Sequence, residues 1–431
     1  MKRVRGWWPA LGALALSGLV GCSGTLDSIG GASGGGRSSA GSSGEVGVSG
    51  AGAGGALTTP LPLTGPATYP NAFKELLGKT EPEIDAKVNA AFAQLFHGDP
   101  DTEAIYVPVG TDQAYIHDVL HDDVRSEGIA VCMVVAVELD KRDEFDKLWT
   151  YAQAKLEQKT GPGSGYFNSI CDDSTACFDP YGMQQFVTAL LFAHGRWGSS
   201  SATPYGSQAL SLLAELKDKE SNNGGVVNNV ASVFDATTAL AREQPNLATA
   251  GYTRASLQMP GAYQLWAQAS GDPFWLRAVF AGRALLVASA DPTTGLWPMR
   301  NYFDGSVASG FEAYRSQGYR TQFNLALDEA WGGGSTAQTA VADRVLGFFT
   351  KQGLNTYGAS YSIDGTVLDP TREVGLVAAN GALAIAGSTP NRIAFVNAVW
   401  SQAIPSGIIR YYDGIMYLMS VLVLSGQYRI Y

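Results

Sequence analysis

Apolar residues recur at helical spacing along most of the chain, and they predict helix after helix with few strands. The helices alternate in character. Segment 124–139 is almost wholly apolar beyond its first turn, whereas 141–158 carries its charges on one face. The same contrast separates 372–387 from 390–402. The predicted helices span 82–97, 124–139, 141–158, 181–196, 205–219, 256–270, 273–290, 319–331, 336–352, 372–387, 390–402 and 411–425.

This alternation predicts two layers of helices. A helix that is apolar all round is buried, and an amphipathic one is half exposed. About twelve helices in two concentric layers fit an all-α (α/α)6 barrel, with six helices inside and six outside. An α-solenoid would also pair its helices, but no sequence signature repeats with a fixed period.

The longest connections between these helices are 98–123, 159–180, 220–255 and 291–318. In a closed helical barrel such connections gather at one mouth and form a cleft. They contain several aromatic residues, namely Tyr115, Tyr166, Phe167, Trp297, Tyr302, Phe303 and Tyr314. Aromatic rings at such a mouth stack on sugars or fill the cores of the loops, and composition favours neither.

The first 22 residues predict an export signal, because Lys2, Arg3 and Arg5 precede an apolar run from 7 to 20. Small residues before Cys22 are typical of a bacterial lipoprotein, in which this cysteine becomes the acylated first residue. An ordinary secretory signal or a membrane anchor is the alternative, although the run is shorter than the roughly 20 residues that span a bilayer. Ser23 follows Cys22 at the position where an acidic residue would retain a lipoprotein in the inner membrane. We therefore expect this protein at the outer membrane or the cell surface.

Residues 23–67 are almost entirely Gly, Ser, Ala and Thr and predict a flexible tether, which leaves 68–431 as the folded domain. The formal net charge of −10 comes without a basic patch, which argues against a nucleic-acid partner. We expect a monomer without a cofactor, held at the membrane through Cys22.

The remaining cysteines divide into two kinds. Cys171 and Cys177 are six positions apart in a polar loop of an exported protein, and we expect a disulfide between them. Cys132 lies within an apolar helix and is expected to be an inert core residue.

One carboxylate begins a helix that is too apolar to lie on a surface. Glu127 follows Arg125 and Ser126 and is separated from the apolar segment 129–139 only by Gly128. Burying a lone ionised carboxylate is very costly, so Glu127 must be paired, hydrogen-bonded or catalytic.

Seven stretches in the same order resemble glycoside hydrolase family 8, particularly its branch of reducing-end xylose-releasing exo-oligoxylanases. They are 115–118 with 123–128, 144–149, 186–191 with 196–198, 259–260 with 263–267, 294–296, 303–305, and 319–320 with 324–328. The resemblance implies an (α/α)6 barrel and inverting hydrolysis of β-1,4-linked sugars. Such hydrolysis uses a general acid and a general base about 6.5–9.5 Å apart. Glu127 matches the acid of the family.

Two other acidic positions of the family differ here. Counting back from Arg320, the expected base is replaced by Gln317, and an amide cannot take a proton from water at neutral pH. In the Pro-Asp-Gly motif of the family, Tyr181 replaces the aspartate, while Asp179 lies one place before the proline. We expect Tyr181, Gln317 and Tyr319 to contact the sugar.

Three nearby carboxylates could substitute for the base. Asp179 is the strongest candidate, although a cap on the helix that begins near Tyr181 is the favoured explanation for it. Asp304 matches a family residue that is not the base, and Glu312 is expected to be exposed in a loop.

A metal site and other catalytic motifs find little support. His117 and His121 are four apart among aspartates, but we expect this segment to be a loop, where that spacing has no geometric meaning. Two functions therefore remain. One is a surface-tethered hydrolase of β-1,4-linked xylan or glucan fragments, and the other is a catalytically impaired relative that binds glycans.

Overall fold

The computed structural model describes residues 57–170, 177–246 and 251–431. The chain divides into two units, 1–49 and 50–431, and every described residue belongs to the second. The predicted signal peptide, the lipidation site Cys22 and the tether up to residue 56 lie outside the described residues.

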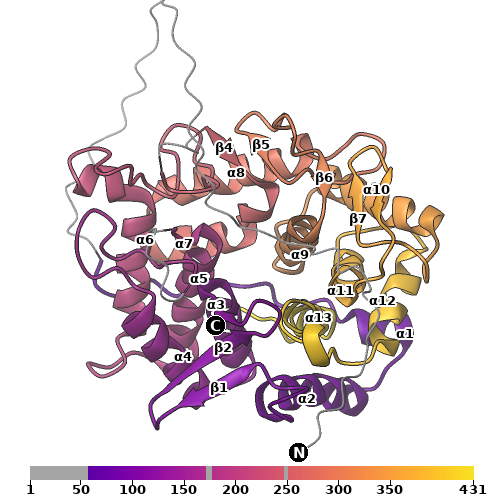
Figure 1. Ribbon diagram of the computed structural model, residues 1–431, viewed down its shortest axis with the longest axis horizontal. Helices are drawn as coiled ribbons and strands as arrows, with labels where there is room; N and C mark the ends of the chain where they lie inside the picture. The colour runs from indigo at the N-terminus through magenta and orange to yellow at the C-terminus, as the bar shows by residue number, and fades with distance from the viewer. Residues whose placement is uncertain (1–56, 171–176, 247–250) are drawn as a thin grey trace, which may run out of the picture. The chain divides into compact units, whose positions relative to one another are not determined.

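Six helices form a closed inner ring. Each packs against the next, and the last packs against the first. Figure 1 looks down this ring, with α3, α9, α11 and α13 near its middle. In chain order the inner helices are α3 (Ser126–Glu138), α5 (Pro180–Trp197), α7 (Pro260–Ser270), α9 (Ser316–Ala330), α11 (Val374–Leu383) and α13 (Tyr412–Leu424).

Six half-buried helices alternate with the inner ones along the chain and pack outside them. They are α2 (Glu81–His97), α4 (Arg142–Lys155), α6 (Tyr205–Asn222), α8 (Pro273–Ala288), α10 (Thr336–Gln352) and α12 (Arg392–Ser401). The (α/α)6 barrel is thus confirmed. A short further helix, α1 (Ala72–Leu77), packs on α12 and was not predicted, because six residues are too few to show a period.

Local start signals place several helices. Thr80 and Glu83 form a capping box at the start of α2. Asp272 caps α8 ahead of Pro273. The segment 256–270 becomes helical at Pro260, because residues 255–257 form a separate 3₁₀ turn.

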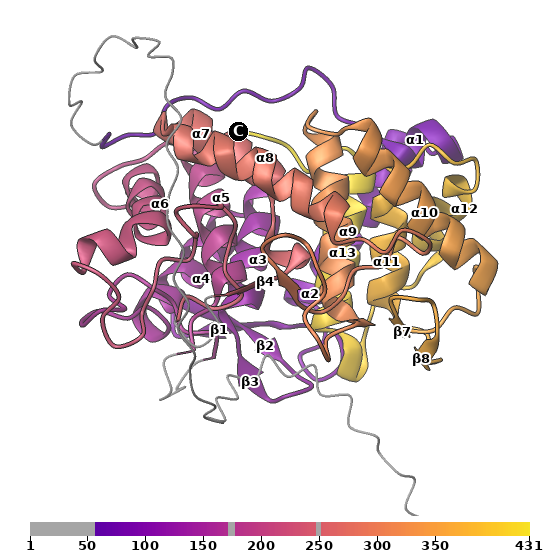
Figure 2. The ribbon, with the colours of Figure 1, turned by 90° about the horizontal axis from the view of Figure 1, so that it is seen from above.

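In residues 57–170, 177–246 and 251–431, all eight strands lie in connections that lead from an outer helix into the next inner one. These connections are neighbours, since β4 pairs with β5 and β6 with β7 across different connections. Figure 2 shows β1, β2, β3, β4, β7 and β8 at the same end of the barrel. The strands are β1 (Tyr106–Val109), β2 (Gln113–Asp118), β3 (Asp123–Val124), β4 (Tyr252–Thr253), β5 (Asn301–Tyr302), β6 (Ala313–Tyr314), β7 (Ser360–Ser362) and β8 (Val367–Asp369).

The segment around His117, expected to be a loop, is instead a three-stranded antiparallel sheet, β1-β2-β3. Along β2 the side chains alternate between buried and partly exposed, which is the period of a strand. His117 bonds Asp122 at 3.0 Å, and His121 bonds Asp118 at 2.8 Å.

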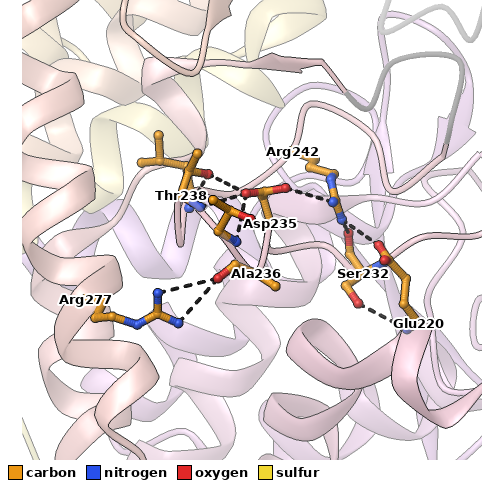
Figure 3. A network of polar contacts seen from close by, with 9 residues as sticks. Glu220, Ser232, Asp235, Ala236, Thr238, Arg242 and Arg277 are labelled. Carbon is orange, nitrogen blue, oxygen red and sulfur yellow. Dashed lines mark hydrogen bonds and ion pairs between the residues drawn. The ribbon is translucent and has the colours of Figure 1, made fainter. Parts of the chain in front are cut away.

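Arg242 fixes the long connection between α6 and α7 (Figure 3). Its Nη1 donates to Glu220 at 2.9 Å, and its Nη2 donates to Asp235 at 3.0 Å. The other carboxylate oxygen of Asp235 accepts from the backbone N–H of Thr238 at 2.7 Å. The loop is therefore held by charge-assisted bonds.

In the described ranges, no helix combines the length and apolar character that a bilayer crossing requires. Cys132 is buried as a free thiol, as predicted, and burial raises its pKa. Cys177 is disulfide-bonded, and its predicted partner Cys171 lies outside the described residues.

Candidate functional site

Glu127 lies in the first turn of α3, and nearly every later residue of that helix is buried. Its carboxylate is 16% exposed and pairs with Arg320, whose Nη2 lies 2.8 Å from Oε2. Arg320 comes from α9, which lies across the ring from α3 in the order of the inner helices. Of the three possibilities that the sequence left open for this carboxylate, the structure shows a charge pair, with a cation from the opposite helix of the ring.

Two aromatic rings hold the Arg320 side chain. The guanidinium carbon lies 4.7 Å from the ring centroid of Tyr181 and 5.4 Å from that of Tyr412. The hydroxyl of Tyr412 donates to the backbone oxygen of Ser316 at 2.6 Å, which ties α13 to the start of α9. Cation–π contacts of this kind fix a guanidinium in place.

Asp179 lies next to Glu127 but is buried. It caps α5 by accepting the Tyr181 N–H at 3.1 Å, and its second oxygen accepts the hydroxyl of Ser126 at 2.7 Å. The predicted capping role is therefore present. Burial, together with the negative charge of Glu127, raises the pKa of Asp179 to about 6.

Helices α3 and α5 approach each other closely at Gly182. A Cβ atom at this position would lie 2.3 Å from Oδ2 of Asp179 and 3.1 Å from the backbone nitrogen of Glu127. Any side chain at 182 would displace one of these groups, so the glycine allows the two carboxylates to lie side by side.

A cavity of about 20 Å³ lies against Glu127, enough for one water molecule. It is lined by Glu127, Gly128, Val131, Tyr181, Arg320, Tyr411, Tyr412, Ile415, Met416 and Met419. The hydroxyl of Tyr411 is buried and has no hydrogen-bond partner among the described residues. A water in the cavity would lie beside both this hydroxyl and the acid.

Gln317 lies in the first turn of α9, three residues before Arg320, and is half buried. Its backbone oxygen accepts from Thr321 at 3.1 Å. The turn that faces α3 from the opposite wall therefore carries an amide at the position where the family resemblance implies a carboxylate.

Tyr319 is fully buried. Its hydroxyl donates to the backbone oxygen of Ala359 at 2.5 Å and lies 3.0 Å from Oε2 of Glu373. Glu373 directly precedes α11, and burial raises its pKa. The backbone N–H of Gly375 donates to Asp413 at 2.8 Å, and burial, with the charge of Glu373, raises the pKa of Asp413 to about 7.

Sequence reasoning missed Tyr411, Tyr412, Glu373 and Asp413. Each lies at or beside the start of an inner helix. The signal was available, since the first turn of every buried helix contributes to the same end of the barrel. Within the described ranges, no cluster of three or more His, Cys, Asp or Glu side chains could hold a metal ion.

Comparisons with known proteins agree with this architecture. The family model for glycosyl hydrolases family 8 matches residues 118–426. The reducing-end xylose-releasing exo-oligoxylanase Rex8A of Paenibacillus barcinonensis is 35% identical over 84% of this chain and 97% of its own. Endoglucanase A of Acetivibrio thermocellus is 23% identical over 71% of this chain and 62% of its own.

Solved structures show the same relationship. A GH8 xylobiose complex from Teredinibacter turnerae superposes with a TM-score of 0.78 at 33% identity, covering 84% of this chain and 98% of that one. The residues that match the family model, 118–426, include Glu127 and all six inner helices. This chain therefore belongs to glycosyl hydrolases family 8.

Proposed function

We propose that this protein hydrolyses β-1,4-linked xylo-oligosaccharides with Glu127 as the general acid. The observation that carries the proposal is the Glu127–Arg320 pair, enclosed by Tyr181 and Tyr412 at the end of a family 8 barrel. The substrate class follows the relatives, because the xylanase at 35% identity covers more of this chain than the endoglucanase at 23%.

In this mechanism Glu127 enters the step protonated, donates that proton to the glycosidic oxygen as the bond breaks, and is left as the carboxylate that pairs with Arg320. Arg320 keeps the carboxyl pointing into the site through its 2.8 Å contact, and the two aromatic rings keep Arg320 in place. Water attacks the anomeric carbon from the other side of the sugar and inverts its configuration.

Activation of that water is where this chain departs from the family pattern. Gln317 offers an amide, and the two oxygens of Asp179 already accept from Tyr181 and Ser126. Asp179 remains the candidate substitute. Each of its oxygens has a second lone pair, so it could accept a proton from water while keeping both hydrogen bonds.

The test is hydrolysis of xylotriose to xylohexaose and of the matching cello-oligosaccharides, followed by chromatography. Glu127→Gln should reduce turnover by about 10²–10⁴-fold, the usual contribution of a general acid. Asp364→Asn is the control, since Asp364 is an exposed loop carboxylate whose oxygen accepts from the backbone N–H of Thr366. Equal activity of the wild type and Glu127→Gln would refute the assignment.

A second function is favoured by one observation, the amide at Gln317. A barrel without a competent base would bind the same sugars without cleaving them. Calorimetry with xylohexaose would then show binding by the wild type, while chromatography would show no product after long incubation.

We also propose that the domain is displayed outside the cell by a lipid on Cys22. The support is the basic, apolar and small-residue order before this cysteine. Metabolic labelling with palmitate should mark the wild type and leave Cys22→Ser unlabelled and released from membranes. Labelling of Cys22→Ser would contradict the proposal.

A further inference from the structure

The aromatic residues of the long connections separate into buried and exposed ones. Four of the seven are core residues at 2% exposure or less, namely Tyr166, Phe167, Trp297 and Tyr314. Tyr302 differs, since 41% of its surface is exposed. Its apolar surface is left in water at the end of the barrel that carries Glu127.

The ring of Tyr302 rests on a second tyrosine. In the β4–β5 pair Tyr252 is opposite Tyr302, and their ring centroids are 5.3 Å apart with a 36° tilt. The neighbouring pair, Thr253 and Asn301, is fully buried. Because successive strand residues point to opposite faces, burial of Thr253 and Asn301 turns Tyr302 toward solvent, with Tyr252 beside it.

The guanidinium of Arg300 packs against the ring of Tyr252. The guanidinium carbon lies 4.9 Å from the Tyr252 ring and 3.9 Å from the Phe311 ring. Its Nη2 also donates to the buried carboxylate of Glu243 at 2.7 Å. The same carboxylate accepts from Nε of Arg254 at 2.9 Å.

Arg254 and Arg300 thus share one buried carboxylate, that of Glu243. Burial lowers the pKa of Arg254, Glu243 opposes that effect, and the charges of Arg300 and Arg320 lower it further. The support under Tyr252 is therefore influenced by the charge of Arg320, which pairs with Glu127.

We propose that Tyr302, backed by Tyr252, is a stacking platform for a pyranose unit of the glycan at a subsite distant from Glu127. This inference rests on the proposed function. A sugar ring presents an apolar face of C–H groups, which an exposed aromatic ring can cover while the hydroxyls stay in water. Tyr302 lies in the connection between α8 and α9 and Glu127 lies in α3, so we expect only longer oligosaccharides to reach both.

The experiment measures binding as a function of chain length. Calorimetry with xylobiose to xylohexaose is done on Glu127→Gln protein, which does not consume the ligand. In this background, Tyr302→Ala should bind xylohexaose about fivefold more weakly and xylobiose unchanged. Tyr302→Trp should retain the affinity for xylohexaose.

Phe280→Ala is the matched control, because Phe280 is a 70% exposed aromatic on the outer helix α8. It should bind every length as the Glu127→Gln parent does. Unchanged xylohexaose binding by Tyr302→Ala, or an equal loss at all lengths, would overturn the platform alone. If the parent binds no oligosaccharide and the wild type cleaves none, the proposed function fails as well.

Discussion

Arg320 places its Nη2 atom 2.8 Å from Oε2 of Glu127 and thereby joins two opposite helices of the inner ring. Both side chains are largely shielded from water, at 12% and 16% exposure. A pair in such surroundings is sensitive to the loss of either partner, because the remaining charge stays desolvated.

Arg320→Met should lower both stability and activity. Removing one partner of a buried pair costs about 3–5 kcal/mol, measured by urea unfolding. Arg283→Met is the control, because Arg283 forms a two-pronged pair with the buried Asp328 between α8 and α9. It should lose stability but keep its activity per folded molecule. A normal kcat for Arg320→Met would show that Arg320 does not hold the acid.

Gln317→Asp should raise xylo-oligosaccharide turnover by about 10²-fold or more, because it provides a proton acceptor at the first turn of α9. Gln317→Asn has nearly the same size and keeps the amide, so it separates chemistry from shape. Steady-state kinetics on xylotetraose measure the difference. Equal rates for the two variants would mean that the base lies elsewhere in the site.

The pKa of Asp179, raised to about 6, makes stability depend on pH. The carboxyl of Asp179 ionises at a higher pH in the folded protein than in the unfolded chain. Its contribution to stability is therefore fully present below about pH 4, where it is protonated in both states, and is lost as the pH rises through 6. The full effect is about 3 kcal/mol.

Asp179→Asn can still cap α5 but does not titrate. Its melting temperature should therefore change less than that of the wild type between pH 4 and 7. Parallel curves for the two proteins over this range would contradict the raised pKa.

Gly318→Ala should destabilise the start of α9. A Cβ atom there would lie 2.1 Å from the ring of Tyr314, a fully buried residue, and overpacking of this kind costs about 1–3 kcal/mol. Gly347→Ala in α10 meets nothing within 4 Å and should instead stabilise its helix by about 0.5–1 kcal/mol. Thermal unfolding of both variants tests the contrast.

The barrel could be predicted because its helices carry their own periodicity. The lack of polar residues in segment 124–139 predicted a buried helix. The charged face of segment 141–158 predicted a helix of the outer layer. The strands were harder, since most have two to four residues and depend on partners in other connections. Only β2 was long enough to show alternation within itself.

The site could be predicted in part. Glu127 was identifiable because a carboxylate in an apolar segment needs a partner or a catalytic role. The sequence near Glu127 did not show that this partner is Arg320, because Arg320 lies on a helix distant in sequence. The roles of Tyr411 and Tyr412 depend on the closure of the ring, which brings α13 beside α3. Asp179 was assigned a cap correctly, because Asp-Pro before a helix is a local signal.

Closure of the ring by α13 on α3 also bears on how the protein is made. Glu127 is synthesised long before Tyr411 and Tyr412, which border it in the folded protein. Domains generally fold as units during synthesis, and contacts distant in sequence form slowly. The pocket around the acid therefore cannot assemble on a growing chain until α13 has emerged, so an unfinished polypeptide carries Glu127 without a catalytic centre.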